Sequence, residues 1–459
     1  MFNRSNRKTD AYTHPNKWRD YQSKLKKKAE TRRSYRRLPA YAVLLCLLIL
    51  VGNELFTLLD KTLEVQQKDI SLIFNDDAID HFDKHTRQRI VRQFSFLTCS
   101  EKNFELTANG TTYQIKSSIT PYLQEFIIDH IDRKNSRYFG FVAMAPATGR
   151  ILSMVSYDKN SKNSNICTTP DYPAASLFKI ITAAAVIEKC GFNCNTPVTF
   201  NDGKYTLYKN QLKDRVNKYT NQITFSESFA GSVNPVFGKI GQNRLGKTTL
   251  ENYAAAFGFN RTFDFEIPMK NSTLSVSDTP YNWAEIASGF NNDTLISPMH
   301  GAMIVSSIVN NGKLLEPTII DEINQHGQVL YHQTSRQISE VIKPSTAVML
   351  KKLMNKTVVS GTASKSFSKF KKDRILSRLR IGGKTGSINN NAEHLKYDWF
   401  AGFAEEKNGS NKIVVSVLVV HQDYIGTRAA SYSRMAIKEY FKNYYANIND
   451  QHEKKSAAL

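Results

Sequence analysis

Metal-ligand motifs are missing from this sequence of 459 residues. Its ten histidines are scattered, and none belongs to an H-E-x-x-H motif or to another pair at metal-ligand spacing. The chain also shows no internal repeat. These absences argue against a metallohydrolase, and we expect neither a metal nor any other cofactor.

Cysteine is scarce as well, with five residues. Cys46 lies in a long apolar run, which leaves Cys99, Cys167, Cys190 and Cys194. Four thiols allow three pairings. Cys190 and Cys194 are close enough in sequence to form a disulfide after a helix end, although two free thiols fit equally well. A zinc site is the weaker alternative, because no histidine pair stands nearby.

Acidic residues are too few to balance the basic ones. The chain has 62 Lys and Arg against 41 Asp and Glu, a formal net charge of +21. Residues 1–37 contain thirteen basic and three acidic residues, so +10 belongs to this segment and +11 to the remaining 422 residues. The stretch 365–380 is also basic, and is either a solvated connector or attracted to an anionic polymer or membrane surface. The excess predicts an anionic environment or partner, and we expect no nucleic acid.

One apolar run, at residues 38–59, is long enough to cross a membrane. In helical form it matches a bilayer core of roughly 30 Å. A polybasic run flanks only its N-terminal end, which favours a transmembrane helix over a buried core helix. The positive-inside rule then predicts a cytoplasmic N-terminus and an extracytoplasmic or periplasmic location for the chain after Asp60. No small-residue cleavage site follows, so we expect an uncleaved, single-pass signal anchor in the bacterial cytoplasmic membrane.

The sequence divides into five predicted parts. In chain order they are a basic cytoplasmic tail, a transmembrane signal anchor, a small juxtamembrane region, a main domain and a polar tail, at residues 1–37, 38–59, 60–136, 137–447 and 448–459.

The main domain has strand patterns at both ends and helical patterns between them. Two β-branched and aromatic runs within 138–157 flank a turn, a hairpin pattern. Residues 173–191 and most of 224–312 have helical patterns, and a further helix is expected at about 344–357. Three more strands and an amphipathic segment follow. We therefore predict an α/β (α+β) fold, with an antiparallel sheet of about five strands, flanking helices and an inserted helical subdomain.

A lysine in the most apolar helix is the first sign of chemistry. Lys179 lies three residues after Ser176 within "PAASLFKIITAAAVIEKCG". A buried ammonium is costly unless it is paired or loses its proton. At this spacing on a helix the two side chains are neighbours. A serine hydroxyl needs a base to become a good nucleophile, and a lysine with a lowered pKa is suited to that role.

Two further motifs follow in a set order. Together the three are Ser176-Leu-Phe-Lys179, Ser232-Val-Asn234 and Lys384-Thr385-Gly386. With "TGRILSMVS", "LISPMHGAMIVSSIVNNGKLLEP", "SGTAS" at 360–364 and "DWFAGFA", they resemble the penicillin-binding protein transpeptidases of the serine β-lactamase superfamily, and among them the monofunctional, class B-like members. The resemblance covers roughly residues 138–447. It implies a membrane-anchored D,D-transpeptidase that cross-links peptidoglycan stem peptides through a serine acyl-enzyme and is a target of β-lactams.

The resemblance also implies roles for the motif residues. Ser176 is the expected nucleophile with Lys179 as its base, and Ser232 helps to relay the proton to the leaving amine. Asn234 is expected to hold both the substrate backbone and the catalytic lysine.

The third motif is expected to bind the donor on the strand that begins at Lys384. Lys384 and Thr385 bind its terminal carboxylate, and Gly386 and Ser387 complete the substrate-binding strand. The backbone N–H groups of Ser176 and Ser387 form the oxyanion hole. Ser387 stands where threonine is commoner in the family, but it keeps a hydroxyl. Val233 replaces the aspartate of many β-lactamases, between two residues whose roles are unaffected.

Several alternatives remain open. A D,D-carboxypeptidase would use the same residues with water as acceptor. A β-lactamase would need an efficient deacylating base that no motif identifies. The chain could also be a non-catalytic β-lactam sensor or cell-wall scaffold. No glycosyltransferase segment is visible, so a separate glycan polymerase is an expected partner.

One motif points elsewhere. "GQNRLGKT" at 241–248 matches the phosphate loop of nucleotide-binding proteins. That loop requires a preceding strand, whereas "NPVFGKI" has a helical pattern. We therefore expect no nucleotide.

Overall fold

The structure is a computed structural model that describes residues 22–24, 87–88, 102–108, 111–161 and 164–457. The predicted anchor at 38–59 lies outside these residues. Among the helices of the described part, none is long and apolar enough to span a membrane. The chain divides into two compact units, Met1–Asp76 and Asp77–Leu459, and every strand and helix named below belongs to the second.

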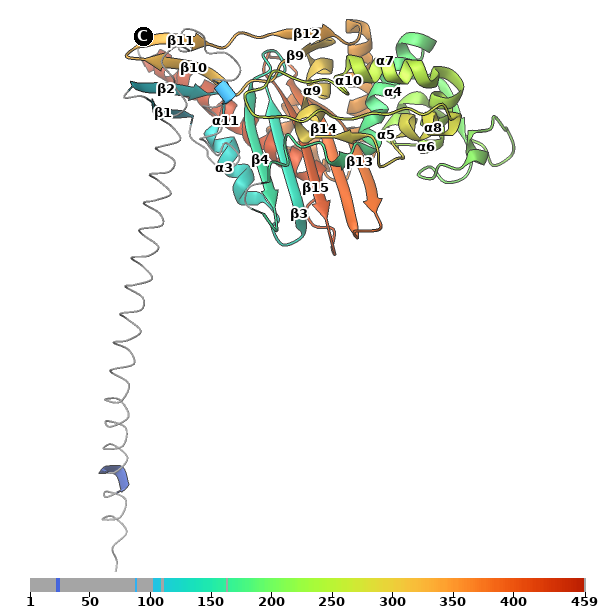
Figure 1. Cartoon of the computed structure of the whole chain (residues 1–459), viewed down its shortest axis with the longest axis horizontal. Coiled ribbons are helices and arrows are strands. Elements are labelled where there is room, and N and C mark those ends of the chain that lie inside the picture. The colour runs from blue at the N-terminus through green and yellow to red at the C-terminus, as the bar shows by residue number, and fades with distance from the viewer. Residues whose placement is uncertain (1–21, 25–86, 89–101, 109–110, 162–163, 458–459) are drawn as a thin grey trace, which may run out of the picture. The chain divides into compact units, whose positions relative to one another are not determined.

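A five-stranded antiparallel sheet forms the centre of this unit (Figure 1). Its spatial order is β13-β14-β15-β3-β4. The strands are β3 (Ser136–Met144), β4 (Ile151–Asp158), β13 (Leu379–Asn390), β14 (Leu395–Glu406) and β15 (Lys412–His421). Two strands therefore come from the start of the domain and three from its end, which confirms the predicted hairpin, the three strands predicted after the helices and the predicted sheet of about five strands.

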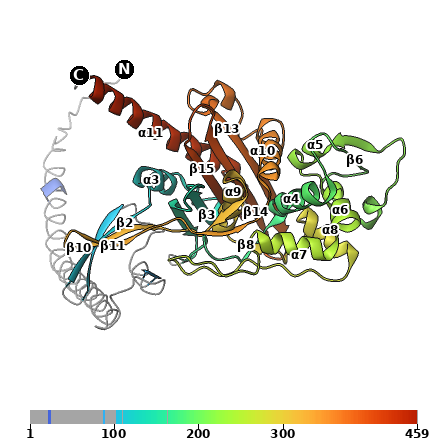
Figure 2. The same ribbon diagram turned by 90° about the horizontal axis from the view of Figure 1, so that it is seen from above.

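Helices bury both faces of this sheet (Figure 2). α9 (Pro298–Val309) covers one face, while α3 (Pro121–His130) and α11 (Ala429–Ala457) pack on the other. Alternate residues of β15 serve the two faces, because side chains along a strand point to opposite sides. Val417 joins the core beneath α3 and α11, whereas Ser416 faces α9 so closely that a Cβ on Gly301 would lie 2.6 Å from its Oγ.

The helical subdomain is inserted between β4 and β13, as predicted. Its helices and helical turns are η1 (Ala175–Phe178), α4 (Lys179–Cys190), η2 (Lys209–Leu212), α5 (Phe225–Ala230), α6 (Asn234–Ile240), η3 (Gly241–Leu245), α7 (Gly246–Ala256), α8 (Pro280–Ser288), α10 (Pro344–Val359), η4 (Phe370–Lys372) and η5 (Leu376–Arg378). Short strand pairs connect them: β5 (Tyr172–Pro173) with β8 (Leu295–Ile296), β6 (Pro197–Phe200) with β7 (Asn221–Thr224), and β9 (Lys313–Leu315) with β12 (Gln337–Glu340). The segment before residues 241–248 is the helix α6 and not a strand, which confirms the helix expected for "NPVFGKI".

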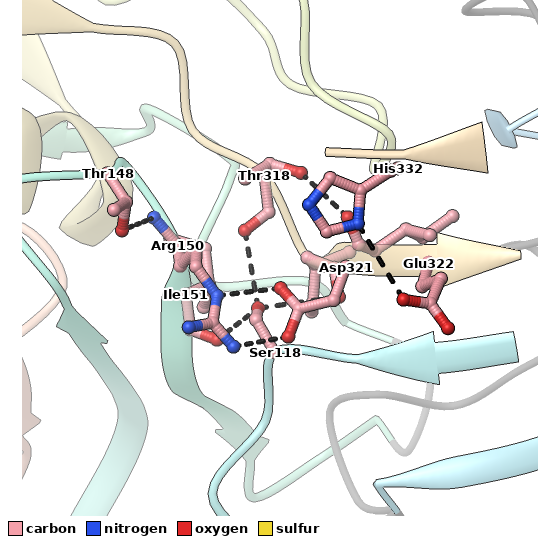
Figure 3. A network of polar contacts seen from close by, with 10 residues as sticks. Ser118, Thr148, Arg150, Ile151, Thr318, Asp321, Glu322 and His332 are labelled. Carbon is pink, nitrogen blue, oxygen red and sulfur yellow. Dashed lines mark hydrogen bonds and ion pairs between the residues drawn. The ribbon is translucent and has the colours of Figure 1, made fainter. Parts of the chain in front are cut away.

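A second, four-stranded sheet was not anticipated from the sequence. It has the order β1-β2-β10-β11, from β1 (Asn103–Ala108), β2 (Thr111–Ser117), β10 (Ile320–Gln325) and β11 (Gln328–His332). The predicted juxtamembrane region thus shares a sheet with residues of the predicted main domain. Arg150 forms an ion pair with Asp321 at the junction, and Ser118 Oγ donates to Ile151 O at 2.6 Å (Figure 3).

Three of the cysteines are described, and all three are free thiols. Cys167 is buried, Cys190 is exposed and Cys194 is intermediate, while Cys99 lies outside the described residues. Of the three possibilities given for Cys190 and Cys194, the structure has the pair of free thiols.

Candidate functional site

The first motif lies at the junction of η1 and α4. Ser176 lies on the short 3-10 turn η1, and Lys179 begins the α-helix, so the expected single helix is divided just before the lysine. The two residues still face each other one turn apart. Ala175 has a φ of +47°, a left-handed conformation that non-glycine residues adopt at a cost. This strained residue lies directly before the half-buried Ser176.

Lys179 is fully buried and makes three contacts with neutral oxygen atoms. Its Nζ lies 2.8 Å from Ser176 Oγ and 2.7 Å from Asn234 Oδ1, and it also donates to the carbonyl of Ser288. Burial lowers the pKa of Lys179 well below its ordinary value, and the nearby charge of Lys384 lowers it further. Both effects favour the neutral amine.

The geometry suits a base once Lys179 is neutral. A neutral amine has two N–H groups and one lone pair. The oxygens of Asn234 and Ser288 accept the two N–H groups, since neither can donate there. The lone pair then faces the hydroxyl of Ser176, which can donate its proton along the same 2.8 Å contact.

The second and third motifs are in direct contact, through Ser232 and Lys384. Lys384 is fully buried on β13, and its Nζ donates to Ser232 Oγ at 3.0 Å and to Thr385 O at 2.9 Å. Burial lowers the pKa of Lys384 to about 7. Ser232 has a φ of +57° in the loop between α5 and α6, so the chain turns sharply there before Asn234 begins α6.

The remaining predicted residues lie along β13. Thr385 is half-buried, Gly386 is buried, and Ser387 is exposed at the edge of the sheet. A Cβ on Gly386 would lie 3.4 Å from Ala174 O, so this strand passes directly beside the turn that carries Ser176.

A buried tryptophan holds that turn against the sheet. Trp399 on β14 is fully buried, pairs in register with Gly386, and donates its Nε1–H to Pro173 O at 2.9 Å. The turn that carries Ser176 is therefore tied to β14, the strand next to the third motif. All three predicted motifs converge on one site.

Sequence reasoning missed three contributors to this site. Ser288 and Tyr205 contribute backbone carbonyls, to Lys179 and to Asn234 Nδ2 respectively. Every residue has a carbonyl, so no residue type could have indicated them. Thr362 is exposed, and its Oγ1 lies 2.5 Å from Thr385 Oγ1. It belongs to the "SGTAS" segment, which carried the family resemblance without a role for this hydroxyl.

Comparison with known proteins gives matches that cover the main domain of the chain. The family model described as penicillin binding protein transpeptidase domain matches residues 139–443. Stage V sporulation protein D of Bacillus subtilis is 25% identical over 328 residues, covering 66% of this chain and 49% of that protein. Peptidoglycan D,D-transpeptidase PbpA of Mycolicibacterium smegmatis is 24% identical over 320 residues, covering 61% of each. The chain thus spans about half to three-fifths of the length of these relatives.

Solved structures share the fold. The D,D-transpeptidase domain of a peptidoglycan glycosyltransferase from Eggerthella lenta aligns with a TM-score of 0.59 at 20% identity, covering 76% of this chain and 85% of that one. PBPA from Mycobacterium tuberculosis aligns with a TM-score of 0.58 at 22% identity, covering 71% and 81%. Because the family model spans most of the chain and contains all three motifs, this protein belongs to the penicillin-binding protein transpeptidase family.

Proposed function

We propose that this protein is a D,D-transpeptidase that cross-links peptidoglycan stem peptides through an acyl-enzyme on Ser176. The observation that carries the proposal is the set of contacts around Lys179. Asn234 Oδ1 and the Ser288 carbonyl accept the two N–H groups of the neutral amine, and its lone pair faces Ser176 Oγ, 2.8 Å from Nζ. Membership of the transpeptidase family and the names of the relatives support the same reaction.

Acylation begins when Ser176 Oγ attacks the carbonyl carbon between the last two D-alanines of the donor. The Oγ proton passes to Lys179 Nζ as the new C–O bond forms. In this proposal the backbone N–H groups of Ser176 and Ser387 stabilise the oxyanion. When the C–N bond breaks, the proton taken up by Lys179 passes by way of Ser232 to the nitrogen of the leaving D-alanine. Lys179 is then neutral again, and the ester on Ser176 remains.

The donor is oriented by its terminal carboxylate. Lys384 in its protonated form, with the hydroxyls of Thr385 and Ser387, offers a positive charge and two donors to this anion. An acceptor amine from a neighbouring stem peptide then attacks the ester carbonyl. The new C–N bond forms, the C–O bond to Ser176 breaks, and the proton lost by the amine passes through Lys179 to Ser176 Oγ. β-Lactams would acylate the same serine and leave it slowly.

The location of this chemistry is part of the proposal. A helix at 38–59 anchors the chain in the bacterial cytoplasmic membrane, with residues 1–37 in the cytoplasm and the catalytic domain outside. A separate enzyme polymerises the glycan strands. Protease treatment of intact spheroplasts tests the topology: the catalytic domain should be cut while a tag at the N-terminus is protected, and the reverse pattern would contradict it.

The reaction is tested by labelling the full chain in detergent with a fluorescent penicillin. We expect one long-lived adduct, which mass spectrometry places on Ser176 and which is absent from Ser176→Ala. The exposed Ser277 in Ser277→Ala provides a control in which labelling persists.

The fate of the adduct separates the alternatives. Rapid loss of the adduct would indicate a β-lactamase. No adduct on a folded chain would overturn the acyl-enzyme and favour a scaffold. With a D-Ala-D-Ala peptide and an acceptor amine, formation of the cross-linked product is expected, whereas release of hydrolysed peptide alone would indicate a carboxypeptidase.

A further inference from the structure

The loop at 201–220, between β6 and β7, presents aromatic and basic side chains to solvent. Tyr205, Tyr208 and Tyr219 are 54%, 63% and 73% exposed. Five basic residues outnumber two acids, which gives the loop a net charge of +3; they are Lys204, Lys209, Lys213, Arg215 and Lys218 against Asp202 and Asp214. A surface of this composition is suited to an anionic ligand.

Hydrogen bonds hold the same loop on its inner side. Gln211 is 1% exposed, and its side chain donates to Asn201 O at 3.1 Å and Gly203 O at 3.0 Å while accepting from Tyr208 N at 2.8 Å. Leu207 is buried, and its carbonyl accepts from Tyr281 OH at 2.6 Å. The exposed side chains therefore project from a preformed backbone, which lowers the entropy lost when a ligand binds.

Residues 204 and 205 are attached directly to the catalytic site. Asn234 N donates to Lys204 O at 2.8 Å, and Asn234 Nδ2 donates to Tyr205 O at 2.8 Å. The other end of the same amide, Asn234 Oδ1, accepts from Lys179. One side chain thus separates this part of the loop from the catalytic lysine.

The position of this segment selects the part of the substrate that it meets. In the proposed reaction the terminal carboxylate lies at Thr385 and the scissile carbonyl at Ser176. Asn234 is expected to hold the substrate backbone, so in this reaction the donor residues that precede the scissile bond pass Asn234. Its backbone and side-chain N–H groups donate to the carbonyls of Lys204 and Tyr205. No ion pair within the described residues involves Lys204, and its Nζ lies 4.9 Å from the centroid of the Tyr205 ring.

We propose that Lys204 and Tyr205 form a recognition site for an acidic residue of the donor peptide, upstream of the scissile bond. This inference rests on the proposed transpeptidase function. The Lys204 ammonium pairs with the carboxylate of the donor, and the Tyr205 ring packs against its aliphatic part. The basic loop thereby selects donors that carry a negative charge at this point.

Competition against fluorescent penicillin on the full chain tests the site without requiring turnover. Two synthetic peptides ending in D-Ala-D-Ala are compared, one with a free carboxylate upstream of the scissile bond and one with the carboxamide. We expect the acidic peptide to slow labelling of Ser176 at about one fifth of the concentration that its amide requires. A difference of this size corresponds to one solvent-accessible ion pair. Lys204→Gln should abolish this preference, and Tyr205→Ala should weaken both peptides.

Lys213→Gln is the matched control, since it removes the same charge from an exposed position of the same loop. It should retain the preference. Equal competition by the two peptides, or no competition by either while Ser176 is labelled, would overturn the recognition site. An equal loss in Lys204→Gln and Lys213→Gln would also overturn it, and would indicate a diffuse surface for an anionic polymer. Failure of penicillin to label Ser176 at all would instead overturn the proposed function.

Discussion

Lys179 and Asp398 are both almost fully buried, but the protein balances their charges in different ways. Lys179 is surrounded by neutral oxygen atoms and has a second buried lysine, Lys384, nearby. Asp398 on β14 receives two hydrogen bonds from the Arg428 guanidinium, at 2.9 and 2.8 Å, and one from Ala429 N at 2.9 Å. His421 Nε2 lies 3.7 Å from the same carboxylate.

The pKa values reflect this contrast. Burial alone would raise the pKa of Asp398, but the nearby His421 and the hydrogen bonds from Arg428 and Ala429 outweigh it, and the pKa is lowered. Asp398 thus stays charged and ties α11 to the sheet, directly across from Ser387 in register. Lys179 is instead driven toward its neutral form. The comparison teaches that one buried charge is compensated for stability, while the other is left uncompensated for reactivity.

The largest effect is expected from removing the uncompensated amine. Lys179→Met should slow acylation of Ser176 by fluorescent penicillin by about 10³-fold, within the range of a general base. The stability change should be small, because the loss of a costly buried amine offsets the loss of hydrogen bonds to Asn234 and Ser288. Lys189→Met, at an exposed position of the same helix, should label normally.

Lys179→Met also tests the lowered pKa of Lys179, through the pH dependence of stability. A lowered pKa means that the folded chain binds fewer protons than the unfolded chain. The free energy of unfolding therefore increases as the pH rises toward the ordinary lysine pKa. Lys179→Met should show a smaller increase between pH 7 and pH 10, measured by urea denaturation. Identical slopes would contradict a neutral Lys179.

Substitution of Asp398, whose charge is balanced by Arg428, should change the stability of the protein. Asp398→Asn leaves the Arg428 guanidinium without its anionic partner and should lower the free energy of unfolding at pH 7 by about 2 kcal/mol. Because the pKa of Asp398 is lowered, its stabilisation is present at neutral pH and is lost as the pH falls through its folded-state pKa. The difference between variant and native protein should therefore shrink in acid.

Asp214→Asn is the control for this measurement. Asp214 is 79% exposed and lies 3.4 Å from Lys239, so its loss should change stability by less than about 0.5 kcal/mol. Equal losses from the two substitutions would show that the Asp398 cluster contributes no more than a surface ion pair.

The smallest effect concerns the second buried lysine. With its pKa lowered to about 7, Lys384 is protonated below that pH and loses its charge above it. The second-order rate of acylation by a penicillin with a free carboxylate should therefore fall by up to about tenfold between pH 6 and pH 8.5. The methyl ester of the same penicillin should not show this decline. Parallel profiles for acid and ester would exclude carboxylate binding by Lys384.

Local patterns in the sequence predicted much of this fold. Runs rich in β-branched and aromatic residues indicated β3 and β4, and three later strand patterns indicated β13, β14 and β15. The helical pattern expected at 173–191 ends where α4 ends, at Gly191, whose φ is +69°. The four-stranded sheet was missed because β2 pairs with β10 across some 200 residues. No local pattern in β2 or β10 indicates that these two strands pair with each other.

The sequence by itself determined which chemical groups the site contains. The types and spacing of Ser176, Lys179, Ser232, Asn234 and Lys384 predicted a nucleophile, a base and an anion-binding cation, and the structure brings these side chains together. Only the tertiary structure decided how these groups are tuned. It buries Lys179 and Lys384 near each other from positions 205 residues apart, and it supplies the carbonyls of Ser288 and Tyr205. Burial, nonlocal pairing and the direction of a backbone carbonyl are properties of the packed chain, because no single residue type encodes them.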